Sequence, residues 1–126
     1  MILFGIMEVL IVEDEVVISL ATARMVESLG HTVMARVTSA EIALAALEKG
    51  LPDLIFMDIH LDGTMDGIQA AEEIRLRWGI PVAFASAFAD EETRKRAASA
   101  GPVAFIPKPL RLASLRTFFE SYKPAV

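Results

Sequence analysis

Five polar residues of the sequence directly follow short, largely apolar runs: Glu13, Asp14, Asp58, Ser86 and Lys108. Three acids, a hydroxyl and an ammonium group are the side chains that could together hold a cation and a phosphoryl group. This chemistry requires that residues far apart in the sequence meet at one place in the fold. The surrounding elements must therefore be identified first.

The three carboxylates suggest a cation site if they lie side by side. Two like charges about 4 Å apart repel each other by about 4 kcal/mol at an effective dielectric of about 20. Such a cluster takes up protons or binds a cation, and an all-oxygen set with room for water and phosphate suits Mg²⁺. The chain has no cysteine and two histidines, so nothing indicates a zinc site.

Asp58 is the candidate nucleophile of this group. A carboxylate beside a bound cation can attack phosphorus and form an aspartyl phosphate, because the cation neutralises the transferred oxygens. Lys108 would add a second positive charge and Ser86 a hydroxyl donor.

The pattern of apolar residues predicts strands and helices in strict alternation. Short runs rich in β-branched residues predict buried strands, and longer segments with helical spacing, such as Val17, Leu20, Ala21, Met25 and Leu29, predict helices. The predicted strands are 8–12, 32–37, 54–57, 82–85 and 103–106. The predicted helices are 16–29, 39–49, 66–78, 90–100 and 112–122. Leu112, Leu115, Phe118, Phe119 and Tyr122 form the stripe expected to cover the sheet.

This alternation predicts an α/β fold with a doubly wound, five-stranded parallel sheet and helices on both faces. The common strand order 2-1-3-4-5 makes the first and third strands neighbours, and ligands bind at the carboxyl ends of such strands. We therefore expect the five polar residues to share one crevice.

The bulk properties describe one small acidic domain. The chain has 126 residues, 54% of them hydrophobic, and a net charge of -5. We expect a single domain over 1–126 without an output domain, residues 1–6 being either an N-terminal appendage or the product of an upstream start codon. The charge disfavours direct binding to nucleic acid or membrane, and the lack of cysteine and of a signal peptide favours a cytoplasmic location.

Four segments closely resemble the response-regulator receiver family, in its single-domain, chemotaxis-regulator-like form with a flavodoxin-like fold. They are LIVEDE at 10–15, LIFMDIHLDGTMDG at 54–67, PVAFASA at 81–87 and FIPKP at 105–109. The resemblance covers essentially the whole chain.

The resemblance implies a role for each site residue. Asp58 resembles the phosphoacceptor, and Glu13, Asp14, Asp58 and the backbone carbonyl of His60 resemble the metal ligands. Ser86 and Lys108 occupy the family's hydroxyl and lysine positions. Ser86 and Phe105 match the switch positions, and the peptide bond between Lys108 and Pro109 is expected to be cis.

The resemblance also implies a function in two-component or phosphorelay signalling. A sensor histidine kinase or a histidine phosphotransfer protein would donate the phosphoryl group to Asp58, with Mg²⁺ as cofactor and Mn²⁺ as a substitute. The chain would be no enzyme, although it would assist its own phosphorylation and dephosphorylation. Its partner-binding surface, expected on the last two helices and the last strand, would switch a separate protein effector, and a phosphorylation-dependent homodimer is allowed.

Three other interpretations compete with this one. A pseudo-receiver would bind partners without phosphorylation. A Mg²⁺-dependent hydrolase of the haloacid-dehalogenase type also uses an aspartyl nucleophile, but needs a second aspartate where this chain has His60. A flavodoxin-type binding module needs a hydroxyl- and glycine-rich loop after the first strand, where this chain has Glu13, Asp14 and Glu15.

The sequence also departs from the common receiver pattern. Asp62 replaces a proline four residues after the phosphoacceptor position, and the Asp66–Gly67 pair comes one residue late. His60 and Phe88 are bulky at the positions that flank the hydrolytic water, which predicts slow self-dephosphorylation. Arg111 lacks the side chain of a helix cap, and we expect His31 to be an ordinary surface histidine.

Overall fold

The computed structural model describes residues 5–87 and 90–122, in which five strands alternate with five helices. The strands are β1 (Glu8–Val12), β2 (Thr32–Val37), β3 (Leu54–Asp58), β4 (Val82–Ser86) and β5 (Ala104–Pro107). The helices are α1 (Val16–Ser28), α2 (Ala40–Leu47), α3 (Gly67–Arg77), α4 (Glu91–Ser99) and α5 (Leu112–Ser121). Each predicted element is present, and its ends differ from the prediction by at most two residues.

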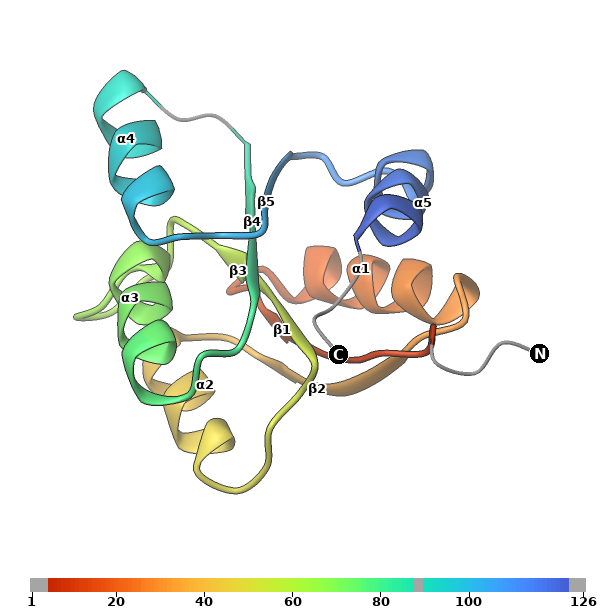
Figure 1. Cartoon of the computed structure of the whole chain (residues 1–126), viewed down its shortest axis with the longest axis horizontal. Helices are drawn as coiled ribbons and strands as arrows, with labels where there is room; N and C mark the ends of the chain where they lie inside the picture. The colour runs from red at the N-terminus through yellow and green to blue at the C-terminus, as the bar shows by residue number, and fades with distance from the viewer. Residues whose placement is uncertain (1–4, 88–89, 123–126) are drawn as a thin grey trace.

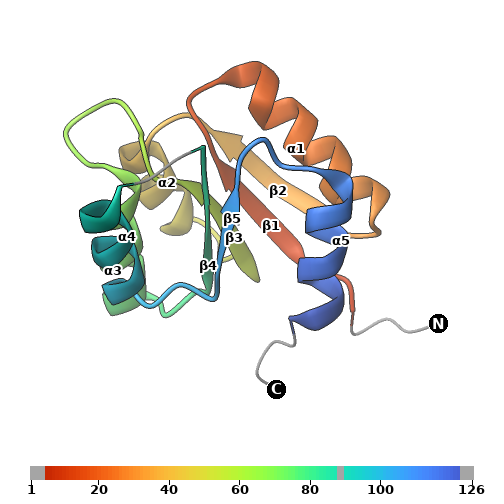
Figure 2. The same ribbon diagram turned by 90° about the horizontal axis from the view of Figure 1, so that it is seen from above.

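The five strands form one parallel sheet in the order β2-β1-β3-β4-β5, as predicted. Helices α1 and α5 cover one face, and α2, α3 and α4 cover the other (Figure 1). Figure 2 shows the same three layers from above. The carboxyl ends of β1, β3, β4 and β5 therefore meet at one edge between the two helical layers.

Side-chain caps define where three of the helices begin. Ser39 accepts a hydrogen bond from the Ile42 amide, Asp66 from the Gln69 amide and Asp90 from the Thr93 amide. Each cap satisfies an amide that has no partner inside its helix. Arg111 makes no side-chain cap, as expected, and α5 nevertheless begins at Leu112.

The buried face of α1 differs from the apolar stripe on which its prediction rested. Val17 is 80% exposed and Leu20 is also exposed, whereas the buried face carries Ser19, Thr22, Ala23 and Val26. Three of these four buried residues are small. The spacing of large apolar residues thus predicted the helix correctly but not its orientation.

The stripe expected on α5 is correct except at its first residue. Leu115 and Phe118 are buried, and Phe119 and Tyr122 pack against the same core, whereas Leu112 is exposed. The Phe118 ring makes an edge contact with Phe56 of β3 and stacks on Tyr122. These aromatic contacts fix α5 against the face of the sheet that α1 also covers.

The expectation that His31 is an ordinary surface histidine is wrong. Its Nδ1 accepts a hydrogen bond of 3.0 Å from the Met7 amide, and its ring stacks on Phe119 with centroids 4.0 Å apart. The side chain therefore joins the start of β1 to α5. The stacking partner is 88 residues away, so no local pattern could reveal it.

No helix among residues 5–87 and 90–122 has the length and apolar character needed to cross a membrane.

Candidate functional site

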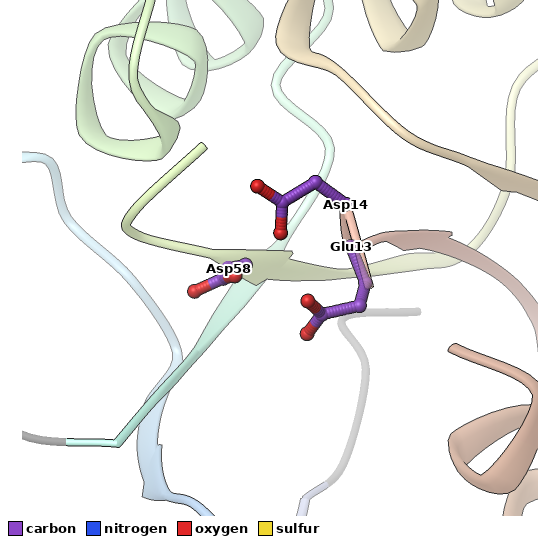
Figure 3. Close-up of side chains that lie close together, drawn as sticks. All are labelled: Glu13, Asp14 and Asp58. Atoms are coloured by element: carbon purple, nitrogen blue, oxygen red, sulfur yellow. The ribbon is translucent and has the colours of Figure 1, made fainter. Parts of the chain in front are cut away.

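The register of the sheet brings the carboxylates together. Val12 pairs with Met57, so Glu13 and Asp58 follow directly from opposed positions on neighbouring strands. Glu13, Asp14 and Asp58 each offer an oxygen atom within 4.8 Å of the others (Figure 3). Glu13 and Asp58 are buried and Asp14 is half-buried. The predicted crevice of three acids is therefore present.

Lys108 enters the same crevice from β5. Ser86 pairs with Pro107 across β4 and β5, and the Lys108 amide donates to the Ser86 carbonyl over 2.8 Å. The peptide bond to Pro109 is cis, in agreement with the expectation. The Lys108 ammonium lies 2.5 Å from Glu13 Oε1 and 3.3 Å from Asp58 Oδ2.

The burial of these charges shifts their pKa values. Desolvation raises the pKa of Glu13, against the hydrogen bond from Lys108, which lowers it. Burial by itself would lower the pKa of Lys108, but the hydrogen bond to Glu13 and the charge of Asp58 raise it above its ordinary value. Lys108 is therefore a fixed positive charge that partly balances the acids.

Backbone amides hold two of the carboxylates in place. The Glu15 amide donates to Glu13 Oε2 over 3.1 Å, and the His60 amide donates to Asp58 Oδ1 over 3.3 Å. The His60 side chain is exposed. The backbone at His60 is therefore next to the phosphoacceptor candidate, as the resemblance requires.

Gly67 fixes the backbone of Asp58 from behind. A Cβ atom at Gly67 would lie 1.9 Å from the Asp58 carbonyl oxygen, and the Gly67 amide donates to the Ile59 carbonyl over 2.9 Å. Only glycine permits this approach of α3 to the end of β3. The sequence marks Gly67 as part of a motif but gives no sign of this contact.

The Ser86 hydroxyl is the site's unsatisfied group. Ser86 is 1% exposed, and its Oγ has no hydrogen-bond partner among the described residues. A buried hydroxyl without a partner is costly, because folding removed it from water. The hydroxyl is therefore free to donate to a group that the described residues do not supply.

Phe105 lies on β5 and contacts a residue of α4. The ring is half-buried, contacts Phe84 edge-on with centroids 6.5 Å apart, and is covered by the Arg94 guanidinium at 4.8 Å. Arg94 belongs to α4, and nothing in the sequence indicated its contact with Phe105. Phe88, which was expected to flank the hydrolytic water with His60, lies outside the described residues.

A mostly apolar cavity of about 380 Å³ opens beside Lys108. It lies between α1 and the segment after β5, and its lining includes Ile18, Met25, Pro109 and Leu110. The acidic crevice is therefore bordered by an apolar surface on its α1 side.

The donor set suits a small hard cation. Three carboxylates supply oxygen only, and such oxygen sets bind Mg²⁺, Mn²⁺ or Ca²⁺ rather than softer metals. The acids carry three negative charges against the single charge of Lys108. The residues present thus fit a divalent cation.

A family model described as the response regulator receiver domain matches residues 9–120. Among curated proteins, the transcriptional regulatory protein PdtaR of Mycobacterium tuberculosis is 33% identical over 107 residues. That match covers 85% of this chain and 52% of PdtaR. The chain thus spans about half the length of this relative.

Solved structures of receiver domains have the same fold. The signal receiver domain of a modulated diguanylate cyclase from Desulfovibrio desulfuricans has a TM-score of 0.85 at 30% identity, with 91% of both chains covered. A CheY-like receiver domain protein from Methanospirillum hungatei has a TM-score of 0.80 at 28% identity, with 90% of both chains covered. The similarity extends over nearly the whole length of each domain.

Proposed function

The chain belongs to the response-regulator receiver family, and from this membership and the geometry of its site we propose that Asp58 accepts a phosphoryl group in two-component or phosphorelay signalling. The single observation that carries the proposal is the joint arrangement of Asp58 with two further acids and Lys108. An ion pair with Lys108 would need only one acid, and the site has three. The remaining negative charge favours a bound cation in this site.

In the proposed reaction, a carboxylate oxygen of Asp58 attacks the phosphorus of a phosphohistidine. The P–N bond breaks, its electron pair returns to the imidazole nitrogen of the donor, and an aspartyl phosphate forms. Glu13, Asp14, Asp58 and the carbonyl of His60 would hold Mg²⁺, for which Mn²⁺ can substitute. When bound, the metal supplies positive charge to the phosphoryl oxygens.

The chain's own residues have separate tasks in this scheme. The His60 amide orients Asp58, and Lys108 offers charge to the transferred oxygens. The buried Ser86 hydroxyl would donate to a phosphoryl oxygen and so gain the partner that it lacks among the described residues. Ser86 and Phe105 are the residues that we expect to move on phosphorylation.

We propose a signalling domain and no independent enzyme. A sensor histidine kinase or a phosphotransfer protein would supply the phosphoryl group, and the response would pass to a separate protein through α4, β5 and α5. The new group adds up to about two negative charges. Shifting a two-state population from 1:99 to 99:1 needs about 5.5 kcal/mol, which several charge-assisted hydrogen bonds can supply.

The test is an intact-mass measurement after incubation with Mg²⁺ and a small phosphodonor such as a phosphoramidate. We expect an adduct of one phosphoryl group on the wild type and none on Asp58→Asn. No adduct from small donors or from phosphohistidine donors would refute the proposal and leave a pseudo-receiver. Continuous release of phosphate from phosphate monoesters, which lack the activated P–N bond of these donors, would instead indicate a hydrolase.

A further inference from the structure

The loop between Asp58 and α3 is held at both ends but contacts the rest of the fold through few side chains. Ile59 and Leu61 are buried, and Asp66 caps α3 while it pairs with Arg96 over 3.3 Å. Residues 62–64 between them are exposed. This exposed stretch needs an anchor if the loop is to keep one conformation.

Glu41 in the first turn of α2 supplies a contact to this stretch. The Thr64 hydroxyl donates to Glu41 Oε2 over 2.8 Å. A Cβ atom at Gly63 would lie 3.2 Å from Glu41 Oε1, so the loop backbone also passes close to the carboxylate. In Figure 2 the yellow-green loop after β3 extends over α2.

The hydrogen bond from Thr64 also stabilises the charge of Glu41. The Thr64 hydroxyl has the largest effect in lowering the pKa of Glu41, the backbone of Glu41 itself has the next largest, and the backbone of Met65 and Thr64 contributes less. These bonds favour the charged form. Gly63 has φ 113°, a conformation that allows the chain to turn toward Glu41 but that few other residues adopt.

We propose that Glu41 is a positioning residue for the phosphoacceptor site: it anchors the exposed stretch of the loop and so fixes the backbone at His60. This inference rests on the proposed function, because His60 is a proposed metal ligand. The path from Glu41 to His60 along the chain is short. Thr64 is bound to Glu41, and His60 lies four residues before it, between the buried residues Ile59 and Leu61. Loss of the anchor leaves the acids in place but lets the carbonyl move.

The test compares Glu41→Ala, Thr64→Val, the double variant and Thr64→Ser. The first readout is amide hydrogen exchange of residues 59–66 in metal-free protein, and the second is calorimetric binding of Mg²⁺ alone. We expect faster exchange and an affinity for Mg²⁺ that is about threefold to tenfold weaker in both single variants, the range for loss of one hydrogen bond. The double variant should bind Mg²⁺ no more weakly than either single variant. Thr64→Ser should match the wild type in both readouts.

Glu91→Ala is the matched control for helix charge. Glu91 lies in the first turn of α4 and makes no ion pair or side-chain hydrogen bond within the described parts of the chain. Its loss should change neither the exchange of residues 59–66 nor the Mg²⁺ affinity. An effect equal to that of Glu41→Ala would reduce Glu41 to an ordinary first-turn acid and overturn the inference.

The remaining outcomes separate this inference from the proposed function. Unchanged exchange, or faster exchange with unchanged Mg²⁺ affinity, overturns the positioning role of Glu41 while phosphorylation of Asp58 stands. A wild type that binds no Mg²⁺ overturns both. A wild type that binds Mg²⁺ with the expected dependence on Glu41 but accepts no phosphoryl group overturns the proposed function alone.

Discussion

The ammonium group of Lys108 lies closer to Glu13 than to Asp58, at 2.5 Å from Glu13 Oε1 and 3.3 Å from Asp58 Oδ2. Lysine therefore holds a carboxylate that the proposed metal also needs. A divalent cation and Lys108 compete for the same negative charge. The consequence is that Lys108 should oppose metal binding while it stabilises the metal-free protein.

Replacing Lys108 by methionine tests this competition. Lys108→Met leaves the buried carboxylates unpaired, so the metal-free free energy of unfolding should fall by about 3 kcal/mol. The affinity for Mg²⁺ should rise about tenfold, because the competing charge is gone. Calorimetry measures the affinity for Mg²⁺, and urea unfolding with and without Mg²⁺ measures the free energy of unfolding. Lys95→Met, on the exposed face of α4, is the control; a weaker affinity for Mg²⁺ in Lys108→Met would contradict the competition.

The Ser86 hydroxyl should matter only after an anion binds. Ser86→Ala removes a group without a partner in the described structure, so its free energy of unfolding should stay within about 1 kcal/mol of wild type. The rise in Tm on adding Mg²⁺ and beryllofluoride, a phosphoryl mimic, should be smaller in Ser86→Ala than in the wild type. Ser19→Ala should lower the free energy of unfolding but leave the rise in Tm unchanged, because Ser19 is buried and accepts a hydrogen bond from Arg36. An undiminished rise in Ser86→Ala would remove Ser86 from the site.

Gly67 should tolerate no side chain. In Gly67→Ala the new Cβ would overlap the Asp58 carbonyl oxygen, so either α3 or the end of β3 must shift. We expect a loss of about 3 kcal/mol in the free energy of unfolding and slower phosphorylation of Asp58. Gly50→Ala is the control, since nothing lies within 4 Å of its Cβ position. Equal stability of the two variants in urea would show that the close approach is absent.

His31 should make stability depend on pH. Burial lowers the pKa of His31 from its ordinary value of 6.5, so between the two pKa values the unfolded chain binds more protons than the folded one. The free energy of unfolding should therefore fall as the pH drops below about 6.5 and level off below the lowered pKa. Protonation of Nδ1 would also remove the acceptor of the Met7 amide.

The matched variant is His31→Asn, whose amide oxygen can replace Nδ1 as acceptor without titrating. Urea unfolding between about pH 5 and 7.5 should show a flatter profile for His31→Asn than for the wild type. Glu41 and Asp90 have lowered pKa values and lose their contributions only at more acidic pH, outside this window. Parallel profiles would show that His31 does not titrate in the folded state as argued.

The sequence predicts the sheet and the gathering of acids because both depend on order along the chain. Each strand is a separate apolar run, and the site residues follow directly from them. The orientation of α1 could not be predicted, because its buried face includes the polar Ser19 and Thr22, which a pattern of large apolar residues does not mark. The contacts of Glu41, Arg94 and His31 join distant elements, and no local pattern encodes them.

The placement of the site residues also has a consequence for how the protein is made. Glu13 follows the first strand of the sheet, and Lys108 follows the last. A chain emerging from the ribosome therefore displays Asp58 and its acidic neighbours before the lysine that balances them can arrive. If β1, β3 and β4 assemble before β5 joins the edge of β4, the acids meet without their lysine, and free Mg²⁺ should then speed the last step of folding, which refolding rates with and without Mg²⁺ would measure.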